Sequence, residues 1–518
     1  MDAVVVHRKR TIVSFVMVAF ALALGVGGYV LTGLNQDGAL PADWQLGAAA
    51  WAALGLVAWG VVRWRLPYAD PLLLPSALLL NGLGLAMIYR LDQADGKDSA
   101  QLQLLWTAIS IAGFVATVVA LRDHRRLQRY TYLWFALGLA ILLTPLVPGL
   151  GFENHGARIW IRIGPYSFQP SEAAKIVLSV AFAAYLVEKK DVLALAGARV
   201  LGIDLPRPRD LGPILVMWLA SLVVLVFQKD LGTSLLFFGL FVMMLYTATE
   251  RPSWAILGVL LLAGMGALGY TFFSHVQTRF SSWLDPFSDY DRNLQVINAQ
   301  FGLAHGGLFG TGWGLGRPYL TPLAKNDFIA AALGEELGLF GLVAVLMVFG
   351  LIVARVLRAA LAAREPFGKL LAAGLAFVFA LQVFTIVGGV TRLLPLTGLT
   401  TPFVSQGGSS LVANYVLLGI MLTITHRVRS PQAEAVADED FASLAQDRTQ
   451  VLKAQPSAES VLTPVSPTRP DEAPRPDPVA FGAPPTGADD LTEVVDVDDG
   501  TQPLSRVDLP RPERGDRP

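Results

Sequence analysis

The sequence predicts an all-α, polytopic integral membrane protein with about twelve transmembrane helices. Of the 518 residues, 53% are hydrophobic and only 16% are charged. The mean hydropathy is +0.51, a value typical of membrane proteins rather than of globular domains. Apolar runs of about 20 residues, the length that crosses a bilayer, recur along most of the chain.

Composition also excludes several kinds of function. The net charge is −1 and no basic stripe with interleaved aromatics appears, so no nucleic-acid partner is expected. The chain contains no cysteine, which excludes disulfides, thiolate metal ligands and cysteine nucleophiles. The first apolar run follows His7-Arg-Lys-Arg10 and is too long for a signal-peptide core, so we expect a retained helix.

The predicted spans follow one another from the N-terminus to residue 426. Two of them flank Lys229-Asp230, and the alternative there is one long span. The twelve ranges are 11–33, 44–64, 70–90, 103–121, 131–149, 171–188, 211–228, 231–249, 253–273, 328–355, 369–390 and 404–426.

The distribution of basic residues predicts the orientation, because Lys and Arg near helix ends favour the cytoplasm. The alternate loops are poor in them: 34–43 has none and 91–102 has only Lys97. With twelve spans, both termini are expected in the cytoplasm and segment 274–328 outside. The predicted cytoplasmic positions include Arg8, Lys9, Arg10, Arg63, Arg65, Arg122, Arg125, Arg126, Arg129, Lys189, Lys190, Arg207, Arg209, Arg355, Arg358, Arg364, Arg427 and Arg429.

Beyond Arg429 the composition changes. Residues 430–518 are rich in Pro, Asp, Glu, Ala and Thr and have no apolar period, which predicts a disordered cytoplasmic tail. The tail is either a solvated tether or a segment that binds a partner or is phosphorylated.

The longest polar interruption, 274–328, is expected to carry the chemistry. Its glycine-rich centre, 302–316, has no preceding strand and no dinucleotide fingerprint, which favours a tightly turning re-entrant loop over a phosphate cradle. The segment ends at Lys325-Asn-Asp-Phe328, where the next apolar helix begins. Asp327 is predicted to act at the membrane surface, and the alternative is a helix N-cap. Helical spacing places Glu335 toward the same cavity and Glu336 nearly opposite.

Two further polar positions lie at predicted helix ends. Glu172 and Lys175 are three residues apart and therefore share a helix face. They are either a simple ion pair at a helix start or a site where Lys175 meets an anionic head group. Asp230 either caps the following helix or holds a basic partner such as Lys175.

The segment 388–410 is broken by prolines and glycines, and irregular backbone at membrane depth must line protein or water. Arg392 adds a cation there unless it only extends along a surface hairpin, and Ser405, Ser409 and Ser410 add hydroxyls. A positive mouth around a few carboxylates would suit a diphosphate ligand with a nearby base. Its predicted cations are Arg158, Arg162, Lys175, Arg317, Lys325 and Arg392.

Four motifs occur in order: Gln169-Pro-Ser-Glu-Ala-Ala-Lys175, Lys229-Asp-Leu-Gly-Thr233, Asn326-Asp-Phe-Ile with Gly334-Glu-Glu-Leu-Gly338, and Leu394-Pro-Leu-Thr-Gly with Pro402-Phe-Val-Ser-Gln-Gly-Gly-Ser-Ser410. Together they resemble the SEDS (shape, elongation, division and sporulation) glycosyltransferases, the RodA, FtsW and SpoVE family. The resemblance covers about 70–426 and implies a ten-helix core. It predicts three parts: an N-terminal two-helix extension at 1–69, typical of some RodA-type members, a core at 70–429 and the tail at 430–518.

The resemblance implies polymerisation of peptidoglycan strands from lipid II, an undecaprenyl-diphosphate-linked disaccharide-pentapeptide, with release of undecaprenyl diphosphate. It implies Asp327 as the essential acid and Asp230, Glu172 and Lys175 as residues of a polar substrate cavity. Asp327 would accept the proton of the acceptor 4-hydroxyl as a general base.

Basic side chains would stabilise the leaving diphosphate, together with a divalent cation, Mg²⁺ or Mn²⁺, whose ligands are unknown. No nucleotide cofactor is implied. The implied partners are a class B penicillin-binding protein (a transpeptidase), other elongation or division proteins and membrane lipid. Lys325-Asn326 departs from the His-Thr that is common in the family.

Several alternatives stay open at this point. The N-terminal extension favours RodA-type cell elongation and shape, and a role in cell division, as in FtsW, is the alternative. A lipid II flippase or a solute carrier is a further alternative, although a carrier should place charges near the midplane and show two related halves. A non-catalytic scaffold would tolerate the loss of Asp327.

Overall fold

The computed structural model describes residues 9–154, 157–164, 166–194, 198–200, 203–205 and 208–431. In this part of the chain, eleven helices are long and apolar enough to cross a membrane. They are α1 (Thr11–Asp37), α2 (Trp44–Arg65), α3 (Leu73–Asp95), α4 (Ser99–Ala120), the span His124–Leu146 that contains α5 (Thr131–Leu143), α6 (Pro170–Ala194), α8 (Leu231–Thr249), α9 (Ser253–Phe272), α12 (Ile329–Ala362), α13 (Pro366–Val390) and α14 (Gly408–Val428).

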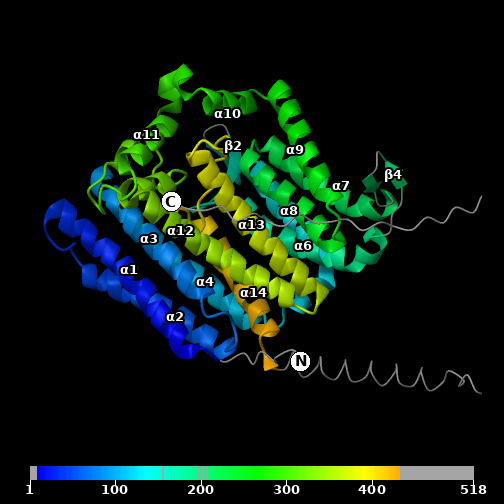
Figure 1. Cartoon of the computed structure of the whole chain (residues 1–518), viewed down its shortest axis with the longest axis horizontal. Coiled ribbons are helices and arrows are strands. Elements are labelled where there is room, and N and C mark those ends of the chain that lie inside the picture. Colours follow the sequence, from blue (N-terminus) through cyan, green and yellow to red (C-terminus); the bar gives the residue numbers. More distant parts are fainter. Residues whose placement is uncertain are drawn as a thin grey trace, which may run out of the picture. The chain divides into compact units, whose positions relative to one another are not determined.

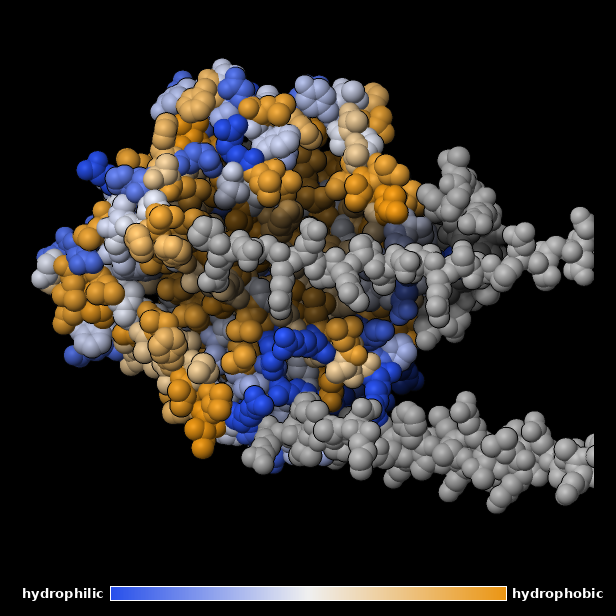
Figure 2. Space-filling view, in the orientation of Figure 1, coloured by the Kyte–Doolittle hydropathy of each residue, from blue (hydrophilic) through white to orange (hydrophobic). Residues whose placement is uncertain are grey.

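The remaining predicted span, 211–228, corresponds to α7 (Pro208–Phe227), whose apolar part within the described residues is the shorter Leu215–Phe227. The polytopic, helical fold class is therefore confirmed. Figure 2 shows hydrophobic residues gathered over the middle of the visible face, with hydrophilic residues mainly toward its edges, as expected for a multi-pass membrane protein. The predicted tail lies outside the described residues from 432 onward.

Burial separates central from peripheral helices. In the most apolar window of α6 and of α14, 83% of residues are buried, against 6% in α9. Because lipid is as apolar as leucine, this difference comes from packing and not from hydropathy. The polar residues of α6 and α14 are consequently enclosed by protein, and both helices belong to the core.

The longest helix, α12, is broken near its start. Gly338 has φ 70° and ψ −174° inside the helix, a conformation that glycine adopts readily. A Cβ there would lie 2.2 Å from the backbone nitrogen of Gly310, so the break also lets the glycine-rich turn approach α12. The first turns of α12 are thereby fixed against segment 302–316.

The polar segment 274–328, predicted as a loop, contains two helices. They are α10 (Ser274–Leu284) and α11 (Tyr290–Gly306), joined by a 3-10 turn at Pro286–Asp289 and followed by another at Pro318–Leu320. Asp289 caps α11 by accepting a hydrogen bond from the backbone of Arg292. Figure 1 shows α10 and α11 at one end of the helices, which we call the Asp327 end.

Two small sheets depart from the purely helical prediction. The strands β1 (Gly151–Asn154), β2 (Ala157–Ile163) and β3 (Tyr166–Phe168) form an antiparallel sheet in which Ile161 pairs with Phe168. A second hairpin joins β4 (Ala198–Val200) to β5 (Ile203–Leu205). Both are too short to span a bilayer, so they do not alter the class.

The two N-terminal helices pack on the core through α2, which contacts α4, and mainly through α1, which lies along α3. The contact is close because Gly25 and Gly82 face each other, and a Cβ on either would lie 3.0 Å from the Cα of the other. Small residues that let two membrane helices approach are a common basis of their association. The predicted boundary at 69/70 falls between α2 and α3.

Candidate active site

Asp327 lies at the start of α12 and is half-buried. The helix begins at Ile329 with Phe328 at the N-cap position, so Asp327 stands one residue before the cap. The preceding backbone is held by the 401–406 turn, because Ser405 Oγ donates to Asn326 O at 2.6 Å and Gln406 N donates to Lys325 O at 2.8 Å. Ser405 therefore positions the backbone that carries the acid.

Arg279 of α10 lies beside Asp327. A Cβ added to Gly398 would be 3.9 Å from Asp327 Oδ2 and 3.8 Å from Arg279 Nη2, so both side chains face the same glycine. Gly398 has φ 73°, a conformation that favours glycine. The guanidinium also donates to Leu396 O, which fixes it to the turn that contains Gly398.

A second carboxylate approaches Arg279 from the start of α8. Asp230 caps this helix, and its Oδ1 accepts a hydrogen bond from Thr233 N at 2.9 Å. Its Oδ2 is buried and has no hydrogen-bond partner within the described part of the chain. Burial raises the pKa of Asp230, while the Thr233 hydrogen bonds and the charge of Arg279 oppose that rise.

The charges around Arg279 are mixed. Burial lowers the pKa of Arg279, and the carboxylates of Asp230 and Asp327 counteract this. The pKa of His275 is lowered by burial and then by the positive charges of Arg279 and Lys229. Two carboxylates, Asp230 and Asp327, therefore act on Arg279 at the Asp327 end, and the exposed Lys229 adds a second positive charge nearby.

Sequence reasoning missed Arg279, although a signal was present. Val276, Arg279, Phe280 and Trp283 have the spacing of one helix face, and Val276 is buried. A single arginine on the apolar face of an amphipathic helix indicates that it faces an acidic group in the protein. For Arg279 these groups are Asp230 and Asp327.

Glu172 and Lys175 form a buried ion pair, with Lys175 Nζ 2.5 Å from Glu172 Oε2. The ammonium also donates to Gln382 Oε1 at 3.0 Å and to Asn414 Oδ1 at 3.4 Å. These three acceptors use all three N–H groups of the lysine. The cation near Asp230 is thus Arg279, while Lys175 joins α6 to α13 and α14.

This cluster continues toward the turn near Asp327. Gln382 Nε2 donates to Thr400 O at 2.8 Å, and Thr400 Oγ1 donates to Ser410 Oγ at 2.8 Å. Asn414 Nδ2 donates to Ser410 O at 2.8 Å, and Ser409 is buried beside it in the first turn of α14. The network therefore holds the 398–401 backbone through its contacts with Thr400.

Three predicted substrate cations have protein partners. Lys325 Nζ lies 2.6 Å from Asp92 Oδ1 and 3.0 Å from Asp95 Oδ2. Arg392 Nη2 donates to Trp283 O at 2.9 Å and to Leu284 O at 3.2 Å, which closes the last turn of α10. Arg158 Nη2 donates to Gly151 O at 3.4 Å within the small sheet. All three cations therefore have acceptors within the protein itself.

The glycine-rich turn folds onto acids of α12 and not onto a phosphate-binding surface. Gly314 N donates to Glu336 Oε2 at 2.8 Å, and Arg317 N donates to Glu335 Oε1 at 2.7 Å. The other oxygen of Glu336 accepts from Arg90 Nε at 2.9 Å. The expectation that Glu335 faces the Asp327 cavity is thus wrong, because its carboxylate holds this turn.

Comparison with known proteins decides the family. The FtsW/RodA/SpoVE model, described as cell cycle protein, matches residues 71–430. The chain belongs to this family. It is 47% identical over 423 residues to the peptidoglycan glycosyltransferase RodA of Mycobacterium tuberculosis, covering 80% of this chain and 90% of that one. The probable peptidoglycan glycosyltransferase FtsW of Geobacter metallireducens is 33% identical and covers 70% of this chain and 95% of its own.

Solved structures give the same family. A peptidoglycan synthase complex that coordinates polymerisation and crosslinking contains a chain with a TM-score of 0.56 and 26% identity, covering 70% of this chain and 98% of that one. The rod shape determining protein RodA of Thermus thermophilus has a TM-score of 0.50 and 25% identity, with coverages of 70% and 98%. Within this FtsW/RodA/SpoVE member, α1 and α2 lie outside the range that the family model matches.

Proposed function

We propose that this protein is a peptidoglycan glycosyltransferase that polymerises lipid II, with Asp327 as its general base. The observation that carries the proposal is the meeting of Asp327 and Arg279 at Gly398, beside Asp230. A carboxylate next to a fixed cation is what a transfer from a diphosphate donor needs. The naming of the mycobacterial relatives as peptidoglycan glycosyltransferases supports this reaction class.

In the proposed reaction, the acceptor 4-hydroxyl oxygen attacks C1 of the donor sugar. The new C1–O4 bond forms as the bond from C1 to the diphosphate oxygen breaks, and the electron pair leaves with undecaprenyl diphosphate. Asp327 takes the hydroxyl proton, which general-base catalysis requires within hydrogen-bond reach. The diphosphate departs as an anion, so no second protein acid is needed.

Arg279 stabilises the charge that develops on the departing diphosphate. A preorganised cation in a site of low dielectric is effective because it does not reorganise during the reaction. The charge of Asp230 acts on Arg279 together with that of Asp327 and so helps to keep the guanidinium charged. The cluster of Glu172, Lys175 and Gln382 positions the 398–401 backbone and does not touch the reacting atoms.

A divalent cation would be held by Asp327 and the diphosphate oxygens, with water completing its shell, as Mg²⁺ commonly binds. Within the described residues, no group of three or more His, Cys, Asp or Glu side chains forms a cation site. When bound, the cation would neutralise diphosphate charge, and no step above depends on it. Basic side chains at the opposite helix ends, including Arg355 and Arg427, support an extracytoplasmic location of the Asp327 end.

The cell-elongation role is favoured over division, because the RodA relatives are more similar in sequence than the FtsW relatives. We also propose a class B penicillin-binding protein as partner. The synthase complex that couples polymerisation to crosslinking supports this pairing.

The test is polymerisation of labelled lipid II by purified protein, with and without a class B penicillin-binding protein. We expect Asp327→Asn to reduce the rate by about 10²–10⁴-fold, the range of a lost general base. Asp289→Asn is the matched control, since Asp289 lies in the same segment and asparagine caps a helix as well as aspartate does. Parental rates in the Asp327 variant would refute the assignment.

A further inference from the structure

A large cavity lies between the N-terminal helices and the core, apart from Asp327. Its volume is about 1090 Å³, and it is lined by residues of α1, α2, α3 and α4. Leu46, Val57 and Leu105 on its rim are exposed, so it opens to the surroundings of these helices. This volume lies just above that of ordinary small-molecule pockets, which is about 300–1,000 Å³, so the cavity has room for a larger ligand such as a lipid.

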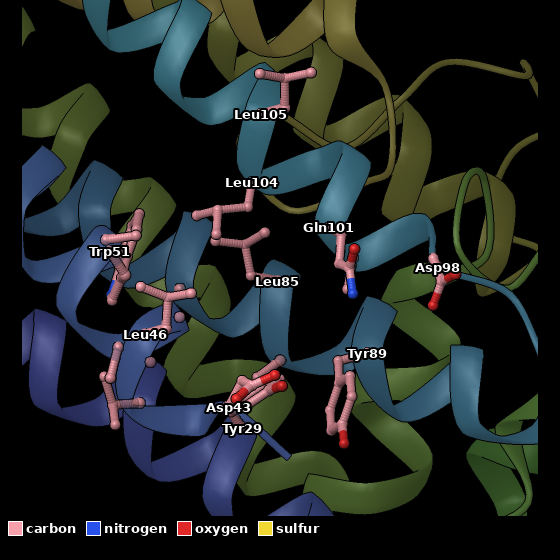
Figure 3. Close-up of a pocket in the computed structure, with 18 of the residues that line it drawn as sticks. Tyr29, Asp43, Leu46, Trp51, Leu85, Tyr89, Asp98, Gln101, Leu104 and Leu105 are labelled. Atoms are coloured by element: carbon pink, nitrogen blue, oxygen red, sulfur yellow. The ribbon is translucent and has the colours of Figure 1, made fainter. Parts of the chain in front are cut away.

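The cavity has an apolar and a polar part. Figure 3 shows Trp51, Leu46, Leu104 and Leu105 mainly toward one side and Tyr89, Gln101 and Asp98 toward the other. The polar part belongs to the Asp327 end, because Asp92, which also lines the cavity, binds Lys325. This is the arrangement of a chain-binding groove whose mouth meets a head group.

The charges at the mouth select the head group. Asp43 and Asp98 precede α2 and α4, yet neither side chain caps its helix. Both are exposed and form no ion pair with another described residue. Lys97 is the basic residue that lines the cavity, and it lies 3.9 Å from Asp95. Asp92 also lines the cavity but is paired with Lys325, so the carboxylates without an ion pair outnumber the one ammonium at the mouth. An anionic head group would be repelled on balance, whereas an amine would be bound.

We propose that the cavity binds one phosphatidylethanolamine molecule. Its acyl chains would lie among the apolar residues of α2 and α4, its ammonium would bind Asp98, and its phosphate would bind the neighbouring Lys97. Charge-assisted hydrogen bonds of this kind are the stronger ones at a surface. Asp43, which Figure 3 shows apart from Asp98, would add negative charge that repels anionic lipids. The lipid would thereby join the extension to α4.

The glycines of α2 provide a matched pair of variants. Gly47 lines the cavity and Gly60 does not, and a Cβ added to either meets open space. Gly47→Leu therefore fills the cavity without a backbone clash, while Gly60→Leu adds the same side chain elsewhere on the helix. Thermal unfolding of both variants controls for folding.

The experiment is native mass spectrometry of the delipidated full chain with added dioleoylphosphatidylethanolamine or dioleoylphosphatidylglycerol. We expect one retained phosphatidylethanolamine and about tenfold weaker binding of phosphatidylglycerol, the effect of roughly one charged hydrogen bond. The preference should vanish in the double variant Asp43→Asn/Asp98→Asn. Gly47→Leu should lose the lipid, and Gly60→Leu should keep it.

Three results would overturn the proposal: equal retention of both lipids by the parent, equal retention by the two glycine variants, or displacement by undecaprenyl diphosphate. The last would identify the cavity as a groove for a polyprenyl chain. Because no readout uses polymerisation, these results are independent of the proposed function.

Discussion

Two acidic side chains near the start of α12, Glu336 and Asp327, lie in opposite kinds of surroundings. Both oxygens of Glu336 are bound, one by Arg90 at 2.9 Å and the other by Gly314 N at 2.8 Å. Arg90 and Glu336 are both almost fully buried. Nine residues earlier, half-buried Asp327 faces Arg279 across Gly398, beside the unpartnered Oδ2 of Asp230.

The difference separates a structural ion pair from the carboxylate proposed to react. A buried pair whose oxygens are all engaged fixes chain segments and has no acceptor left for a substrate. In the Asp327 region, Asp327 is half-buried and so keeps access to solvent, which a proton acceptor requires. Variants of the two regions should therefore differ in what they damage: stability in one, rate in the other.

The largest effect is expected at the structural pair. Glu336→Gln leaves Arg90 buried and uncompensated, which should lower the free energy of unfolding by about 3–5 kcal/mol. Thermal unfolding in detergent measures this loss. Glu250→Gln is the matched control, because Glu250 is exposed and its ion pair with Lys369 spans 3.8 Å. A similar small change in both variants would contradict the structural role.

The next effect is on the rate. Arg279→Met should lower polymerisation by about 10²–10³-fold, as the loss of one preorganised charge stabiliser does. Arg279→Lys should recover part of this rate, because charge returns without the planar guanidinium. Arg292→Met is the control, since Arg292 is an exposed arginine of the same segment. If the two methionine variants polymerise equally fast, Arg279 does not act on the leaving group.

The raised pKa of Asp230 predicts how the stability of the protein depends on pH. The folded pKa of Asp230 is raised by burial, so between the usual carboxyl pKa near 4 and the raised value the folded state binds the extra proton. Stability from this group therefore falls as pH rises through that window, by at most about 1.4 kcal/mol per pH unit. Asp230→Asn keeps an acceptor for Thr233 and should flatten this slope in thermal unfolding. An unchanged slope would mean that another group titrates.

The parts of the site that sequence predicts are local ones. The Glu172–Lys175 pair follows from helical spacing, and the Asp230 cap follows from its place between two apolar runs. The spans follow from hydropathy because a bilayer imposes their length. Each of these depends on neighbours within a few residues.

The parts that sequence does not predict are long-range contacts. The sequence predicts Lys325 as a substrate cation. In the structure, α3 places Asp92, 233 residues away in the chain, beside the Lys325 ammonium. Gln382 and Asn414 join the Lys175 cluster only through the packing of three helices. The small sheet at 151–168 was likewise not predicted from the sequence, since its strands are short and lie between apolar helices.

The smallest effect is expected at Trp313, through which the glycine-rich turn contacts the N-terminal extension. Trp313 Nε1 lies 2.8 Å from Gly28 O and 2.9 Å from Thr32 Oγ1, and Asn35 donates to Trp313 O at 2.7 Å. Trp313→Phe keeps the apolar contact but removes the N–H donor, which should cost about 0.5–1.5 kcal/mol.

Thermal unfolding of Trp313→Phe is compared with that of Trp64→Phe, because Trp64 is 72% exposed on α2. The turn is held on one side by Glu336 and on the other by Trp313, so the tryptophan variant should destabilise less than Glu336→Gln. A loss as large as that of the ion pair would mean that the extension, and not the α12 acids, fixes the turn. The extension would then belong to the structural support of Asp327, and variants lacking α1 should polymerise more slowly even when they insert normally.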